Sequence, residues 1–232
     1  MRLTVLTGAG ISTDSGIPDY RGPNGLWTRD PENEKLVTYD YYVADPQLRR
    51  RSWLARRANP AWEAEPNAAH RALAARPDTW IVTQNVDRLH QRAGSPSDRV
   101  LELHGNMIEA LCIDCGARST TQQALDRLDA GEDDPRCLAC GGILKTATVM
   151  FGESLDSAVL QLAAAAAASA DVFIAVGTSL QVHPAAGLVD IAHGAGARVV
   201  IVNAEPTPYD RIAAEIVREP IGTALPDLLG RL

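Results

Sequence analysis

The sequence lacks any apolar run of the roughly 20 residues that a membrane-spanning helix needs. No segment with a charged start and an apolar centre precedes the first expected strand. The alanine run from Ala163 to Ala168 is short and predicts a helix of small side chains. We therefore expect a soluble, cytoplasmic protein that does not contact a membrane.

The sequence also lacks an excess of positive charge. Lys and Arg total 22 against 29 Asp and Glu, and the net charge is −7. Sequence-independent binding to nucleic acid needs a basic face that displaces counterions, so we expect no direct contact with nucleic acid. An acidic surface attracts basic peptides. The length of 232 residues allows one large domain, or one domain with a small insertion.

Cysteine is scarce, and its four positions are grouped. Each half of the group is a C-x2-C pair followed by glycine, and twenty-one residues separate the two pairs. This pattern predicts one structural zinc ion with four thiolate ligands and no open position for water. No cysteine is then left as a nucleophile. The predicted ligands are Cys112, Cys115, Cys137 and Cys140.

The cysteine pattern has two other interpretations. Two disulfides would suit a secreted protein, but no leader supports export. A zinc ribbon that binds nucleic acid would have to tolerate several acidic residues between the two pairs, and these repel phosphate. A module that holds its segment against the main domain fits better.

The chain opens with a short apolar strand, Leu3–Leu6, and the turn Gly8-Ala9-Gly10. Glycine permits a tight turn close to a ligand, and the N–H groups of a following helix suit a pyrophosphate. Thr13 stands where the full dinucleotide fingerprint has a third glycine, so the turn alone fits a plain strand-to-helix connection equally well. The continuation 19–22, DYRG, adds an acid, an aromatic ring and a guanidinium to a loop that would cover a nucleotide.

Short apolar runs alternate with helical stretches through the rest of the chain. This order predicts an α/β fold, a Rossmann-like and mostly parallel sheet with helices on both faces. The domain would comprise residues 1–104 and 147–232, with a mobile loop and helical insertion at about 19–66, and the zinc-binding module would occupy 105–146. Further expected strands are 80–83, 100–103, 172–176 and 199–202. Expected helices are 34–57 and 68–75. In the first of these helices, the side chains expected to face inward are Tyr39, Tyr42, Leu48 and Trp53.

Polar residues gather where the expected strands end. Gln84, Asn85 and Asp87 follow one strand, at the edge where doubly wound sheets bind ligands. His104 follows another and precedes Gly105, which exposes the ring. We take His104 as the candidate catalytic histidine, whereas His70 is expected to pack within a helix without binding a ligand.

Several segments together resemble the signature of the sirtuins, which are NAD-dependent protein deacylases. They are GAGIS followed by SGIPDYRG, QNVD, LHG and the paired C-x2-C motifs, and the resemblance covers nearly the whole chain. It implies that the Rossmann-like domain binds NAD and that the zinc is structural. The catalytic residues implied are His104, Asn85 and Asp87.

The resemblance also implies contacts with NAD and with a peptide. The pyrophosphate would lie on the first turn, the adenosine end on the later strands, and the nicotinamide near the QNVD segment. An acyl-lysine peptide would add as a strand between 149–153 and 177–182. Implied NAD contacts are Gly8, Ala9, Gly10, Ile11, Asp19, Tyr20, Arg21, Gln84, Asn85, Asp87, Gly177, Thr178, Ser179, Asn203, Glu205 and Ile221. Implied substrate contacts are Val149, Phe151, Gly152, Glu153, Val182, Trp53 and Arg56.

The implied reaction begins when the acyl oxygen of acyl-lysine attacks the ribose carbon of NAD as nicotinamide leaves. His104 then acts as general base on a ribose hydroxyl, which takes the acyl group. The products are lysine, nicotinamide and O-acyl-ADP-ribose, with the acyl group acetyl or longer. Partners would be acyl-lysine proteins or peptides, and the enzyme would be a monomer.

The chain departs from the family pattern in two places. Many sirtuins have Arg-Pro where this chain has Lys145-Thr146, which we expect to alter the hinge beside the zinc module. The branch that removes succinyl and malonyl groups uses a Tyr and an Arg three positions later, and Trp53 with Arg56 is the nearest equivalent. We therefore expect no strong preference for acidic acyl groups.

Two alternative functions stay open at this point. GPNGLW, HGNM and GTSLQVHP are more like the branch associated with ADP-ribosyl transfer and longer acyl chains, which keeps a mono-ADP-ribosyltransferase open. A non-catalytic NAD-sensing scaffold is the third possibility, and it would make His104 dispensable.

Overall fold

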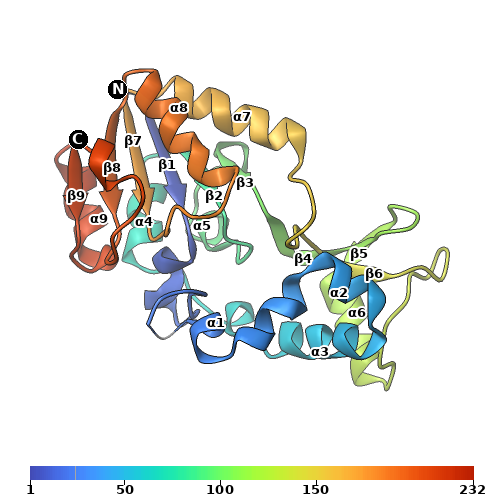
Figure 1. Ribbon diagram of the computed structural model, residues 1–232. Coiled ribbons are helices and arrows are strands. Elements are labelled where there is room, and N and C mark those ends of the chain that lie inside the picture. Colours follow the sequence, from blue (N-terminus) through green and yellow to red (C-terminus); the bar gives the residue numbers. More distant parts are fainter. Residues whose placement is uncertain (24) are drawn as a thin grey trace.

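The computed structural model describes residues 1–23 and 25–232, so Asn24, within the expected cofactor loop, lies outside the described residues. The described residues contain a six-stranded sheet and a three-stranded sheet, which form two lobes (Figure 1). The larger sheet has the order β3-β2-β1-β7-β8-β9, and all neighbouring strands in it are parallel. Its strands are β1 Leu3–Thr7, β2 Trp80–Thr83, β3 Val100–Glu102, β7 Val172–Val176, β8 Arg198–Val202 and β9 Glu215–Val217.

Helices cover both faces of the larger sheet, as the alternation of strands and helices predicted. One face packs against α7 and α8, and the other against α4 and α9. Because both faces are covered, the central strands are continuous apolar runs, and every residue of β1 and β7 is buried. The α-helices are α1 Leu26–Arg29, α2 Tyr39–Ala44, α3 Pro46–Arg57, α4 Ala68–Ala74, α5 Leu89–Arg92, α6 Thr121–Asp129, α7 Ser157–Ala168, α8 Leu188–Gly194 and α9 Ile221–Gly230.

Several connections are short 3-10 helices. The segment after the first glycine turn is one of these, where the sequence predicted the start of an ordinary helix. The 3-10 helices are η1 Ala9–Ser15, η2 Pro31–Val37, η3 Pro60–Trp62, η4 Ser97–Arg99, η5 Ala185–Gly187 and η6 Asp210–Ile212.

The helical insertion is not the single helix that was predicted over 34–57. It is divided into η2, α2 and α3. Thr38 pairs with Phe151 in an isolated parallel bridge, which breaks the helical path between η2 and α2. Pro46 then begins α3, and the Asp45 carboxylate caps it by accepting a hydrogen bond from the Gln47 amide. Tyr42 and Leu48 are buried, as predicted.

The smaller sheet is antiparallel with the order β5-β4-β6. Helix α6 packs against β4, and α3 of the insertion contacts α6, so the insertion and this sheet form the second lobe (Figure 1). The strands are β4 Gly105–Cys112, β5 Arg118–Thr120 and β6 Leu144–Thr148.

Within the described part of the chain, every helix is too short or too polar to qualify as a membrane span.

Candidate active site

The carboxyl ends of β1, β2, β7 and β8 meet at one edge of the larger sheet. The chain runs outward from β1 to β2 and β3 on one side, and returns to β7 and β8 on the other, so the strand order reverses beside β1. A crevice opens at such a reversal. A cleft of about 720 Å³ lies there, and Gly8, Gln84, Gly177 and Asn203, each the residue after one of these strands, line it.

The glycines of the first turn pack against the end of β7. The Gly8 amide donates to the Val176 carbonyl (3.0 Å), and the Gly10 amide to the Gly177 carbonyl (2.9 Å). A Cβ atom on Gly8 would lie 2.7 Å from the Gly177 carbonyl oxygen, and one on Gly10 would lie 2.8 Å from the Gly177 Cα. The absence of side chains therefore allows two backbone turns to touch at the floor of the cleft.

Below this turn, Ser12 joins two residues of the QNVD segment. Its hydroxyl donates to the Asp87 carboxylate (2.7 Å), and the Asn85 amide nitrogen donates to the same hydroxyl (3.2 Å). Asn85 also donates to the Gly8 carbonyl (3.1 Å). Burial raises the pKa of Asp87, while hydrogen bonds from the Leu89 amide and Ser12 lower it. The cluster fixes Asn85 at the cleft surface.

His104 lies between β3 and β4, with Leu103 separating it from the end of β3, and it is half-buried in the cleft wall. Its Nδ1 is 3.0 Å from the Gln84 carbonyl oxygen. Burial lowers the pKa of His104, and the bond to Gln84 opposes that shift in part. Gly105, at φ +70°, makes the turn possible, because a Cβ atom there would collide with the Ala147 carbonyl oxygen.

An aromatic cluster joins the cofactor loop to the opposite wall. The rings of Tyr20 and Trp27 lie 4.7 Å apart between centroids, and those of Trp27 and Phe151 lie 5.4 Å apart. The Arg21 guanidinium lies over the Trp27 ring at 4.5 Å. The loop therefore contacts the 149–153 segment through side chains that line the cleft.

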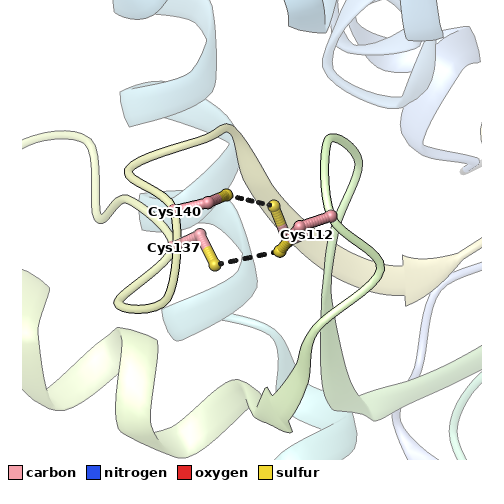
Figure 2. Close-up of side chains that lie close together, drawn as sticks. Cys112, Cys137 and Cys140 are labelled. Atoms are coloured by element: carbon pink, nitrogen blue, oxygen red, sulfur yellow. Dashed lines mark hydrogen bonds between the residues drawn. The ribbon is translucent and has the colours of Figure 1, made fainter.

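The four cysteines form a second site in the smaller lobe. Figure 2 shows the thiols of Cys112, Cys137 and Cys140 turned toward one another. The Cys112 and Cys140 sulfurs are 3.6 Å apart, the Cys115 and Cys137 sulfurs are 3.7 Å apart, and all four lie within 4.8 Å of one another. Zinc–sulfur bonds of about 2.3 Å in a tetrahedron place the sulfurs about 3.8 Å apart. The four thiols are thus positioned to bind a zinc ion.

Comparison with known proteins agrees with this geometry. The Sir2 family model matches residues 8–184. The chain belongs to the Sir2 family. It is 63% identical over 231 residues to "NAD-dependent protein deacetylase 2" of Streptomyces coelicolor, covering 98% of this chain and 96% of that protein. It is 43% identical to the "NAD-dependent protein deacylase" of Mycobacterium tuberculosis, covering 100% of this chain and 98% of that protein.

Solved sirtuin structures share the fold. A Sir2 variant with a deacetylated p53 peptide and 3′-O-acetyl-ADP-ribose matches with a TM-score of 0.89 and 37% identity, covering 99% of this chain and 93% of that one. A Sir2–p53 peptide–NAD⁺ structure matches with a TM-score of 0.87 and 36% identity, with the same coverage. The alternation of strands and helices therefore predicted the Rossmann-like sheet correctly, and the motif resemblance predicted the sirtuin family correctly.

Most of the site residues predicted for this sirtuin line the one cleft. Ile11 and Asp87 instead lie beneath the cleft surface, and Ile221 packs at the start of α9. The predicted residues that line the cleft are Gly8, Ala9, Gly10, Asp19, Tyr20, Arg21, Arg56, Gln84, Asn85, His104, Val149, Phe151, Gly152, Glu153, Gly177, Thr178, Ser179, Val182, Asn203 and Glu205.

Trp53 requires a correction. It was predicted to contact the substrate beside Arg56, but its side chain is only 1% exposed and packs with Ala110, Cys112 and Leu125 in the core of the smaller lobe. Residues three positions apart on a helix lie near one face, so the spacing alone could not show that only Arg56 reaches the cleft. Arg56 lines the cleft, with its guanidinium 3.4 Å from the Thr148 hydroxyl, and burial lowers its pKa.

Ser12 and Trp27 contact predicted site residues but were not themselves predicted as such. Ser12 lies within the GAGIS motif, but its bonds to Asn85 and Asp87 span more than seventy positions. Trp27 was included only in the mobile loop and helical insertion at about 19–66, and its contact with Phe151 joins segments far apart in the chain. The resemblance was the only signal for Ser12, and the DYRG–GLW spacing was the only one for Trp27.

Proposed function

We propose that this chain is an NAD-dependent protein-lysine deacylase, which moves an acetyl or longer acyl group from lysine to ADP-ribose and releases nicotinamide. One observation carries the proposal: a single cleft joins the Gly8 turn, the His104 ring and the segment that ends at Glu153. A nucleotide, a base and an acyl-lysine side chain thus have neighbouring places. The relatives named as deacetylase and deacylase support the same activity.

His104 acts as the general base in this proposal. Because the Gln84 carbonyl can only accept a hydrogen bond, Nδ1 carries the hydrogen and Nε2 is left to accept a proton. The lowered pKa of His104 keeps the ring neutral at pH 7. Bound NAD supplies the electrophilic ribose carbon and the hydroxyl that His104 deprotonates.

The remaining site residues have positioning roles in the proposal. The Gly8–Gly10 turn and the ends of β7 and β8 hold NAD, and Asn85 orients its nicotinamide end, with Asp87 fixing Ser12 beneath. Tyr20 and Arg21 close over the cleft and exclude water, which would otherwise attack the ribose carbon. The peptide pairs by its backbone between 149–153 and 177–182, so many acyl-lysine proteins are substrates.

Incubation with NAD and an acetyl-lysine peptide tests the function. Nicotinamide release and loss of the acetyl mass from the peptide are expected together, and His104→Ala should lower the rate by at least a hundredfold. His193→Ala, which changes an exposed histidine on α8, is the matched control and should keep full activity. Acetyl loss without NAD would contradict the proposal. Nicotinamide release that does not need acyl-lysine would favour the ADP-ribosyltransferase.

The pH profile tests the role of His104 separately. Since burial lowers its pKa, the base form persists below the ordinary histidine value, and the acid limb of kcat/KM should be centred below about pH 6.5. An acid limb centred above that value would contradict a buried histidine base.

Other features of the chain stay predictions. We propose that it divides into the two domains 1–104 with 147–232, and 105–146, and the smaller sheet, which runs from Gly105 to Thr148, supports this division. A monomer in the cytoplasm without nucleic-acid contacts is our expectation, supported for nucleic acid by the net charge of −7.

A further inference from the structure

Lys145 has surroundings that no step of the proposed reaction uses. It is one of two lysines in the chain and is only 3% exposed. Its ammonium donates to the Thr148 carbonyl (2.7 Å) and to the Glu153 carboxylate (2.9 Å). A buried cation is expensive unless it is paired, so this pair is expected to serve a defined geometry.

The pair closes a turn that carries the cleft wall. The same Glu153 oxygen that Lys145 contacts also accepts a hydrogen bond from the Met150 amide (2.8 Å), and the Glu153 amide donates to the Met150 carbonyl (3.0 Å). Both ends of the segment 148–153 are therefore tied to one ammonium group. Between them lie Val149, Phe151 and Gly152, which line the cleft.

Two further contacts fix this segment to its neighbours. The Val149 amide donates to the His104 carbonyl (2.9 Å), which joins the segment to the candidate base. Phe151 exchanges backbone hydrogen bonds with Val37 and Tyr39 of the insertion, each 2.9 Å long. The segment 149–153, whose backbone edge would pair with a peptide, is therefore attached at three points: to His104, to the insertion and to Lys145.

We propose that Lys145 is a positioning residue for the acyl-lysine peptide, acting through Glu153 to hold residues 149–152 in the conformation that pairs with the substrate backbone. The inference rests on the proposed deacylase function. It assigns Glu153 a role within the turn, in place of the substrate contact that the sirtuin resemblance implied. NAD, which lies toward the glycine turns, does not depend on this attachment.

The test measures KM and kcat for wild type and Lys145→Met with NAD and an acetyl-lysine peptide. The KM for the peptide should rise at least tenfold, while the KM for NAD and kcat each change less than threefold, because an interaction equal in ground and transition states affects KM alone. Lys145→Arg should restore most of the peptide KM, since it keeps the cation. Binding of a fluorescein-labelled acetyl-lysine peptide, measured without NAD, should weaken in parallel.

Matched variants separate this role from general stability. Arg118→Met removes the exposed pair with Glu109 on the same small sheet and should leave the peptide KM unchanged. Glu153→Gln keeps the size and an acceptor but loses the charge, and should raise the peptide KM even if Lys145→Met fails to fold. An unchanged peptide KM in Glu153→Gln, or a loss of kcat and both KM values together, would overturn the inference. A wild type without NAD-dependent deacylation would instead overturn the proposed function.

Discussion

At Gly177 the backbone of β7 turns directly against the first glycine loop. Its φ is +58°, and a Cβ atom there would lie 2.6 Å from the Gly10 carbonyl carbon. Gly177→Ala should therefore cost more than the roughly 1 kcal/mol of a left-handed alanine, with about 1–3 kcal/mol added by the collision. Because relief of the collision shifts the Gly8–Gly10 turn, the KM for NAD should rise at least tenfold. Urea unfolding and steady-state kinetics measure the two effects.

Gly196 offers the control for this change. Its φ is +88°, yet a Cβ atom there would meet nothing within 4 Å. Gly196→Ala should show the backbone cost alone, about 1 kcal/mol, with an unchanged KM for NAD. Equal effects of the two variants would show that contact between the turns does not shape the NAD site.

The same residues show what a sequence can predict at this scale. The GAG turn was expected directly after the first strand, where the structure has it, because an apolar strand and two glycines are local features. The steric reason for the glycines could not be predicted, since the surface that they meet is Gly177, more than 160 positions later. Trp53 faces inward as predicted, but its role as a substrate contact was wrong for a related reason: its spacing from Arg56 is local, whereas the core that buries it comes from β4 and α6.

Within the second lobe, a buried arginine holds helix α3 to the loop before the second cysteine pair. Arg49 is 2% exposed, and its guanidinium donates to the Asp134 carboxylate and to the carbonyls of Tyr42 and Val43. Asp134 precedes the second cysteine pair, so this cation joins the insertion to the loop that leads into the metal site.

Replacement of Arg49 should weaken the contact between α3 and the loop that leads into the second cysteine pair. Arg49→Ala removes the buried cation from Asp134, which keeps only its pair with Arg136, and from two carbonyls, so we expect a loss of about 3 kcal/mol in the free energy of unfolding. The adjacent Arg50 makes an exposed pair with Asp133, so Arg50→Ala should cost less than about 1 kcal/mol. Urea unfolding of both variants, with their zinc content, measures the difference. A loss as small in Arg49→Ala as in Arg50→Ala would show that the buried pair does not hold the helix.

Elements were predicted well where one local pattern determines them. The strands at 80–83 and 172–176 were expected at the bounds observed, because a strand buried on both faces is a continuous apolar run. The insertion was not resolved into its parts, since the break at Thr38 depends on pairing with Phe151. Strand β4 was also missed, because its partner β6 lies beyond the cysteine-rich segment.

Two buried histidines lie beneath the strand ends that carry the cleft. His70 and His90 are 0% and 1% exposed, and their rings meet edge to face at 4.9 Å. The His90 Nε2 is 3.0 Å from the Thr7 hydroxyl, which also bonds to Thr83, so the pair supports the ends of β1 and β2. Burial lowers the pKa of His70 to about 4 and that of His90 to about 3, and each ring's charged neighbour, Arg71 or the other histidine, adds to the shift.

These pKa values make the stability of the whole molecule depend on pH. A histidine whose folded pKa is depressed binds its proton only in the unfolded chain between pH 6.5 and the folded value, so stability is full above pH 6.5 and declines as the pH falls. Between pH 7 and pH 5 each histidine should contribute a loss of about 2 kcal/mol. Urea unfolding at pH 5, 6, 7 and 8 measures the decline.

The slope of the free energy of unfolding against pH identifies the histidines responsible for the decline. This slope can be compared between variants even if they differ in stability at pH 7. His90→Gln removes one titrating group and retains a side-chain donor toward Thr7, so the histidine contribution to the loss between pH 7 and pH 5 should fall by about half. His193→Gln removes an exposed histidine on α8, far from this pair in the chain, and should leave the slope as in the wild type. If His90→Gln and His193→Gln both retain the wild-type slope, the acid sensitivity arises elsewhere, and the buried pair holds the strand ends without responding to pH.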